Sequence, residues 1–191
     1  MPNFLFQTLV LLAFSTYFCY SAPLNATTST TCDSPAEMAK AQKCYPMMME
    51  FGNKTVELAS LDMKINDTRL LSMMKLCKDL KTCLNSSCHF DESMKKDVRI
   101  ACDGIALKNT YFMECLTKIK TGAPDLSKYT CMAHSSMDGA DQMFTTKKWC
   151  TKQLFRGVCG EKSLNNFDRH CRIMVRLFGL ADKDGDDEDD E

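Results

Sequence analysis

Apolar residues recur at spacings of three and four along most of the chain, which is the pattern of amphipathic helices. The clearest apolar stripe lies near the C-terminus and consists of Leu164, Phe167, Cys171, Met174 and Phe178. Arg172 and Arg176 occupy the other face, and Gly179 supplies a C-terminal stop. We therefore predict a helix over this segment.

Two helices are predicted earlier in the chain. The capping box Ser34-Pro35-Ala36-Glu37 begins the first, which continues to about Leu61 and is interrupted or kinked at Pro46. Asn66 or Asp67 caps the second, whose apolar positions are Leu70, Met74, Cys77, Leu80 and Leu84.

Two more helices are predicted between these and the C-terminal one. The third helix begins near Asp91, and a break is expected at Gly104 or Asn109 before the pattern resumes up to Ile119. The fourth runs from about Asp141 to Val158. No strand-period alternation or internal repeat is present. The predicted fold class is therefore all-α, an irregular bundle of about five helices cross-linked by several disulfides.

The N-terminus reads as a secretory signal peptide, residues 1–21. Phe4 to Phe14 is an apolar run too short to span a bilayer, and small residues follow near Ser21. Cleavage is expected after Ser21, with cleavage after Ala26 as the alternative. We expect a secreted, extracellular protein without transmembrane anchoring, because no second apolar segment of spanning length follows.

The remaining chain is assigned to three segments. Residues 22–31 are a Thr/Ser-rich flexible leader, residues 32–180 a single disulfide-rich helical domain, and residues 181–191 an acidic, disordered tail. Asp182 to Glu191 hold eight acids and one lysine, a net charge of −7, so the formal charge of −1 leaves +6 on the rest of the chain. The tail lacks the spacing of a calcium-binding EF-hand loop, because its glycine, Gly185, precedes the sixth loop position.

Eleven of the twelve cysteines lie beyond the signal peptide, which indicates disulfides in an oxidising compartment. They are Cys32, Cys44, Cys77, Cys83, Cys88, Cys102, Cys115, Cys131, Cys150, Cys159 and Cys171. Symmetry about the intervening turns suggests that Cys77 pairs with Cys102 and Cys150 with Cys171. An odd number leaves one cysteine free, intermolecular or bound to a small thiol, and Cys88 in a polar turn is our candidate.

Four Asn-x-Ser/Thr sequons begin at Asn25, Asn53, Asn66 and Asn85. Chance would give roughly one in a chain of this composition. We therefore expect a glycoprotein with these asparagines at the surface.

The sequence offers no catalytic, cofactor or metal motif. His89 follows Cys88, whose expected disulfide argues against a metal pair. His134, Ser135, Ser136 and nearby Asp138 have the residue types of a hydrolase triad but lack a nucleophile elbow. His170 is expected on the polar flank of a core stripe. We predict no cofactor and no enzyme, and keep a secreted hydrolase as the third alternative.

Two kinds of binding function are compatible with the composition. Fourteen methionines would suit an adaptable apolar pocket, hence an extracellular carrier of a small apolar ligand or lipid, although they also pack irregular cores. Basic surface at Lys95-Lys96, Lys147-Lys148-Trp149 and Arg169 to Arg176 favours an interaction protein that binds an extracellular protein or polyanionic glycan. Nucleic acid is not expected, because the basic stretches lack interleaved aromatic residues.

A family resemblance rests on the cysteine ladder and its interleaved apolar residues: Leu76-Cys77, Cys83, Tyr111-Phe112-Met113-Glu114-Cys115-Leu116, Cys150, Cys159 and Phe167-Asp168-Arg169-His170-Cys171. From about Cys32 to Phe178 the chain resembles the nematode-expanded, secreted, cysteine-rich family of unknown function that is often called the T20D4.11-like domain. The resemblance implies an extracellular, disulfide-bonded, mostly helical domain without an established biochemical activity. It carries no catalytic residue. The odd cysteine departs from a fully paired framework, so no connectivity is transferred.

Overall fold

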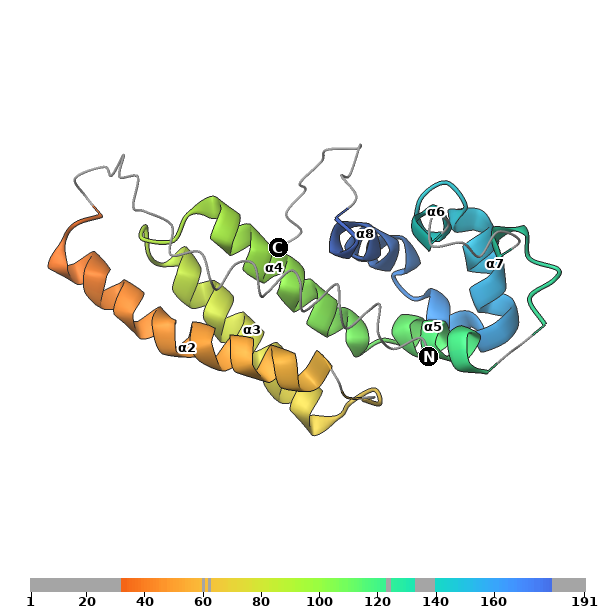
Figure 1. The fold of residues 1–191 in the computed structure, drawn as a ribbon, viewed down its shortest axis with the longest axis horizontal. Coiled ribbons are helices and arrows are strands. Elements are labelled where there is room, and N and C mark those ends of the chain that lie inside the picture. Colours follow the sequence, from red (N-terminus) through yellow and green to blue (C-terminus); the bar gives the residue numbers. More distant parts are fainter. Residues whose placement is uncertain (1–31, 60, 62, 123–124, 133–139, 180–191) are drawn as a thin grey trace. The chain divides into compact units, whose positions relative to one another are not determined.

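The fold is all-α, as predicted. The computed structural model describes residues 32–59, 61, 63–122, 125–132 and 140–179, and within these ranges it contains seven α-helices and no strand (Figure 1). The chain divides into two compact units, one ending at Cys102 and the other starting at Asp103. The boundary falls inside α4 (Glu92–Lys108), so this helix contributes residues to both units.

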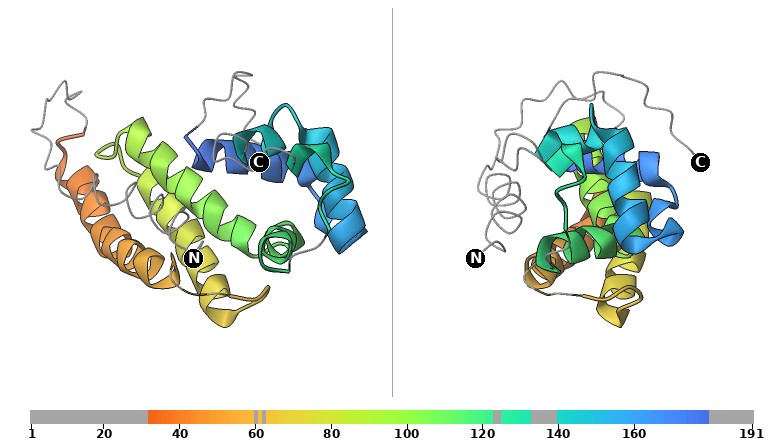
Figure 2. Two further views of the ribbon diagram at one scale, coloured as in Figure 1. Left: turned by 45° about the vertical axis from the view of Figure 1, so that its right-hand side comes forward. Right: turned by 90° about the vertical axis from the view of Figure 1, so that its right-hand side faces the viewer.

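Unit 1 is built around α2 (Pro35–Ala59) and α3 (Thr68–Asn85), which lie side by side (Figures 1 and 2). The predicted cap of α2 forms, with the Glu37 N–H donating to Ser34 Oγ at 3.2 Å. Asp67 caps α3 by accepting from the Arg69 N–H at 2.9 Å. The helix α2 continues through Pro46 without the predicted interruption. Fully buried side chains on the facing sides of these helices include Cys44, Leu70, Met73, Leu80 and Leu84.

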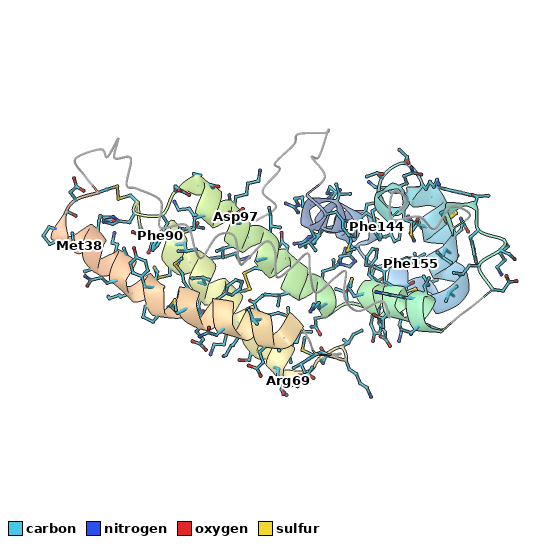
Figure 3. The ribbon with its side chains drawn as sticks, viewed as in Figure 1. Met38, Arg69, Phe90, Asp97, Phe144 and Phe155 are labelled. Atoms are coloured by element: carbon cyan, nitrogen blue, oxygen red, sulfur yellow. A yellow bond between two sulfur atoms is a disulfide. The ribbon has the colours of Figure 1, made fainter. Side chains whose placement is uncertain are left out.

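Unit 2 holds α5 (Tyr111–Thr121), α6 (Ala140–Phe144), α7 (Lys148–Cys159) and α8 (Phe167–Leu177), with 3-10 turns η1 (Thr130–Met132) and η3 (Glu161–Leu164). Phenylalanine rings fill its core, and two of them, Phe144 and Phe155, are marked in Figure 3. The ring of Phe112 lies 4.8 Å from that of Phe155 and 5.6 Å from that of Phe167, measured between centroids. Such close aromatic packing makes α5, α7 and α8 one structural body.

Two predicted helices of unit 2 have different boundaries in the structure. The predicted helix over 141–158 is divided into α6 and α7 by a turn, in which the Lys147 N–H donates to Gln142 O at 2.7 Å. The C-terminal helix begins at Phe167, because Asn166 adopts a left-handed backbone with φ 54° and separates η3 from α8. The break that the sequence placed at Gly104 or Asn109 lies at Asn109, where Thr110 caps α5.

Five disulfides are present among the described residues, three in unit 1 and two in unit 2. In unit 1 they are Cys32–Cys88, Cys44–Cys83 and Cys77–Cys102, and in unit 2 they are Cys115–Cys159 and Cys131–Cys150. The suggested Cys77–Cys102 pair is thus present.

The predicted bond between Cys150 and Cys171 is wrong. Cys150 is bonded to Cys131, while Cys171 is free and buried. Symmetry about one turn failed because η3 and the left-handed Asn166 interrupt the assumed antiparallel pair. Cys88, our candidate for the unpaired cysteine, is bonded to Cys32.

Candidate functional site: a groove beside an exposed tryptophan

An open groove of about 610 Å³ lies in unit 2, between α7 and the segment that leads into η1. This volume is within the range of small-ligand sites. The lining residues come from both walls: Lys128, Tyr129, Thr130, Trp149, Cys150, Gln153, Arg156 and Gly157. Trp149, Gln153 and Arg156 are four and three residues apart, so the pitch of α7 brings them to one side of the helix.

Covalent and steric constraints hold the two walls together. The Cys131–Cys150 disulfide ties η1 to the first turn of α7, and the Cys131 N–H also donates to Cys150 Sγ at 2.9 Å. Gly157 lets the second wall approach, because a Cβ at this position would overlap the Tyr129 hydroxyl. The Tyr129 ring can therefore take this position only because residue 157 is a glycine.

Trp149 is the most prominent side chain of the groove. It is 75% exposed, the largest exposed fraction among the exposed large apolar residues of the described chain. Tryptophan is enriched at binding interfaces, because its indole combines a large apolar face with a polar N–H. The groove therefore presents a ready aromatic platform at its edge.

Two cationic side chains, Lys128 and Arg156, line the same groove as Trp149. Lys128 Nζ lies 5.2 Å from the centroid of the Tyr129 ring, in a cation–π arrangement. Arg156 Nε donates to Glu161 Oε1 at 2.7 Å, which orients the guanidinium. A guanidinium has five N–H donors, so this bond leaves others to reach a ligand. Aromatic faces and cations together suit a ligand that has both apolar surface and negative charge.

The buried polar groups of unit 2 lie in its core. His170 is 9% exposed, its ring meets Phe112 edge-on at 5.2 Å, and its Nδ1 has no hydrogen-bond partner. Burial, and secondarily Arg169, lowers the pKa of His170. Burial raises the pKa of the Cys171 thiol to about 12, so this thiol stays protonated and unreactive at neutral pH. Our expectation of His170 on a polar flank was wrong, since the side chain is buried.

The other predicted site residues do not gather with the groove. Asn53, Asn66 and Asn85 are exposed, and all three belong to unit 1, as does the exposed His89. Asn25, the acidic tail and the segment holding His134, Ser135, Ser136 and Asp138 lie outside the described residues. The described side chains contain no group of three or more His, Cys, Asp or Glu that could hold a metal ion.

Sequence reasoning identified Lys147-Lys148-Trp149 but missed the rest of the groove. The spacing from Trp149 to Gln153 and Arg156 was available as a helical pattern. Tyr129 and Lys128 carried no such signal, because the Cys131–Cys150 bond that brings them to α7 is not apparent from spacing.

The described helices do not include one with the length and apolar character needed to cross a bilayer. Together, the helices and five cystine bridges define a disulfide-rich all-α protein. The chain belongs to the family described as "Domain of unknown function (DUF19)", whose model matches residues 32–179 and so includes residues of both units. This match confirms the family resemblance seen in the cysteine ladder. No curated protein and no solved structure matches the chain.

Proposed function

We propose that the protein is a secreted, N-glycosylated binding protein whose groove takes an acidic saccharide. The observation that carries this proposal is the exposed Trp149 beside two cationic side chains, Lys128 and Arg156, in one groove. Binding rather than catalysis is its mode of action, and the five disulfides suit an extracellular setting.

The chemistry of an acidic sugar matches both features of the groove. The apolar face of a pyranose ring packs on the Trp149 indole, and a carboxylate or sulfate receives charge-assisted hydrogen bonds from Lys128 and Arg156. The Gln153 amide can both donate to and accept from sugar hydroxyls. Because the groove is open to solvent, we expect such binding to weaken as salt increases.

The distribution of sequons supports unit 2 as the binding unit. All four sequons precede Cys102, whereas no Asn-x-Ser/Thr sequence follows it. If the sequons are used, unit 1 carries the N-glycans and the surface of unit 2 is left without them. A recognition surface gains from this arrangement, because bulky glycans block access.

A carrier of a small apolar ligand is the second candidate. The observation in its favour is the pair of aromatic side chains, Trp149 and Tyr129, which give the groove apolar surface. The two candidates differ in salt dependence, because only the acidic ligand is held by charge.

We would test the proposal with protein secreted from a eukaryotic host, titrated with sulfated, carboxylated and neutral oligosaccharides at low and high salt. Trp149→Ala should reduce affinity for the acidic sugars about tenfold or more, and Lys128→Ala should reduce both affinity and salt dependence. Tyr111→Ala and Arg172→Ala remove an exposed aromatic residue and an exposed cation of unit 2 that do not line the groove, so both should bind normally.

The outcomes separate the candidates. Salt-independent binding of a neutral lipid that requires Trp149 would favour the carrier. Binding to none of these probes, or equal effects of groove and control substitutions, would refute the groove as the site.

A further inference from the structure

One side of α2 exposes large apolar side chains in a line. Met38, Tyr45, Met49 and Val56 are 49%, 54%, 55% and 51% exposed, and at 100° per residue they fall within an arc of about 40°. We call these four side chains the α2 face. Met38 is marked near the N-terminal end of the helix in Figure 3, and the face extends for about 27 Å to Val56.

Charged residues avoid the α2 face. Within about 60° of its centre line the other described residues are Pro35, Ala41, Gln42, Gly52 and Asn53, of which Ala41 is buried and none is charged. The helix nevertheless has six charged side chains, and four of them form the ion pairs Lys40–Glu37 and Lys54–Glu50. A solvent-exposed helix face is normally polar, so an uncharged apolar line of this length indicates a contact surface.

The α2 face is symmetric along the helix. Met38 and Val56 each lie nine residues from Met47, and Tyr45 and Met49 each lie two residues from it. Two copies of α2 packed antiparallel, with Met47 at the level of the two-fold axis, therefore place Met38 level with the second copy's Val56. In the same arrangement Tyr45 of each copy lies level with the other copy's Met49. An interface of two identical patches requires this self-complementarity.

We propose that the α2 face is the interface of a symmetric dimer formed by antiparallel α2 helices of two copies of this chain. No like charges oppose each other across it, and Gly52 leaves room at the level of the second copy's Gln42. The Tyr45 ring is held in place by edge-on packing against the buried Phe90 ring, with 5.8 Å between the ring centroids. Asn53, a predicted glycosylation site, lies at the edge of the face, where a bulky N-glycan would block the contact, so the dimer requires this sequon to be unused.

The dimer should be weak. Four half-exposed side chains bury less than the roughly 800 Å² per partner of a standard interface. We therefore expect dissociation in the micromolar range. The inference is independent of the groove and of its ligand, because the α2 face belongs to unit 1 and the groove to unit 2.

Sedimentation velocity of the secreted full chain over a micromolar concentration series tests this proposal. Met49→Glu alone and Tyr45→Lys alone should each be monomeric at concentrations where the wild type dimerises. An equimolar mixture of the two variants should dimerise again, because the antiparallel register sets the new carboxylate of one copy level with the new ammonium of the other. A parallel pair would not bring these two positions together.

Ala39→Glu is the matched control, since it adds the same charge at an exposed position of α2 about 100° from the face. It should dimerise like the wild type, and circular dichroism should show that all variants keep their helix content. A wild-type chain that stays monomeric throughout, a Met49→Glu variant that still dimerises, or a mixture that stays monomeric would each overturn the proposal.

Discussion

Gly157 shapes the groove of unit 2 because it has no side chain. Gly157 lies in the helix α7, where alanine would favour the helix by about 1 kcal/mol relative to glycine. Glycine is nevertheless present, and a Cβ there would displace the Tyr129 hydroxyl. The sequence thus gives up some helix propensity at a position where the Tyr129 side chain of the opposite wall leaves no room for a Cβ.

His170 should make the stability of the protein depend on pH. Burial lowers its pKa below the ordinary value of 6.5, so the unfolded chain takes up a proton more readily than the folded one. The free energy of unfolding should therefore be highest above about pH 6.5 and fall as the pH drops below it. Urea unfolding at a series of pH values between about 7.5 and 5 measures this slope.

Two variants isolate the contribution of His170. His170→Leu removes both the proton uptake and the unpartnered Nδ1, so its stability should change less over this pH interval. His89→Gln removes an exposed histidine and should keep the wild-type slope. An unchanged slope in His170→Leu would show that protonation of this residue is not the cause.

Sequence patterns identified those residues whose role depends on near neighbours. Trp149 was noticed because two lysines precede it, and Asp67 because it begins an apolar stripe. In the structure Asp67 accepts hydrogen bonds from the Arg69 side chain and backbone, which lower the pKa of its carboxyl to about 2. His170 was misjudged because its flanking Asp168 and Arg169 suggested a polar environment, whereas Phe112 of α5 covers it.

At the level of helices, stripes and caps predicted the regular elements, but short interruptions escaped detection. The Ser34 box and Asp67 were predicted to start α2 and α3, and each satisfies otherwise free N–H groups. Thr110 does the same for α5, but the sequence pattern did not identify it. The turn between α6 and α7 contains no glycine or proline from which it could be predicted. Its backbone is held by tertiary contacts such as the bond from Thr151 Oγ1 to Met143 O at 2.7 Å.

Disulfide pairing was predictable where two continuous helices meet at one turn. Cys77 and Cys102 satisfy this condition, because they are placed on α3 and α4 across the short connection from Ser86 to Asp91. Cys131 lies in a 3-10 turn beside residues without helical periodicity, so nothing in its surroundings pointed to Cys150.

The Cys131–Cys150 bond should order the groove wall more than it stabilises the fold. It closes the shortest of the five covalent loops, 19 residues apart, against 44 for Cys115–Cys159. In the chain-entropy model, loss of a loop of this size costs about 3 kcal/mol and loss of the longer one slightly more. In a Cys131→Ala/Cys150→Ala variant, the Cys131 position should lose amide protection from hydrogen exchange, because its N–H donates to Cys150 Sγ.

The comparison variant is Cys115→Ala/Cys159→Ala. This variant should unfold at a lower temperature than the wild type. Under conditions where it is folded, its Cys131 amide should still be protected from hydrogen exchange. If protection at Cys131 survives in the first variant, the groove wall is ordered by packing and not by the disulfide.

Across the whole molecule, two compact units carry different surface chemistry. Unit 1 holds all four sequons and the uncharged α2 face, whereas unit 2 holds the cationic groove. The DUF19 match covers both units, and each unit has its own disulfides and its own buried side chains. Self-association through one unit and ligand binding through the other could therefore be altered separately by mutation.

The acidic tail should oppose the binding of anionic ligands. Asp182 to Glu191 have a net charge of −7 against +6 on the rest of the chain, so we expect the tail to repel an acidic saccharide and to compete for cations such as Lys128 and Arg156. A chain that ends at Ala181 should bind a sulfated oligosaccharide more tightly at low salt, and the difference should vanish at high salt as screening removes both effects. A tail of equal length with its acids changed to Asn and Gln should behave like the truncation, because charge and not length is the cause. Isothermal titration calorimetry of the full chain, the truncated chain and the chain with the neutral tail tests this prediction. Equal affinities at low salt would mean that the tail does not act on the groove.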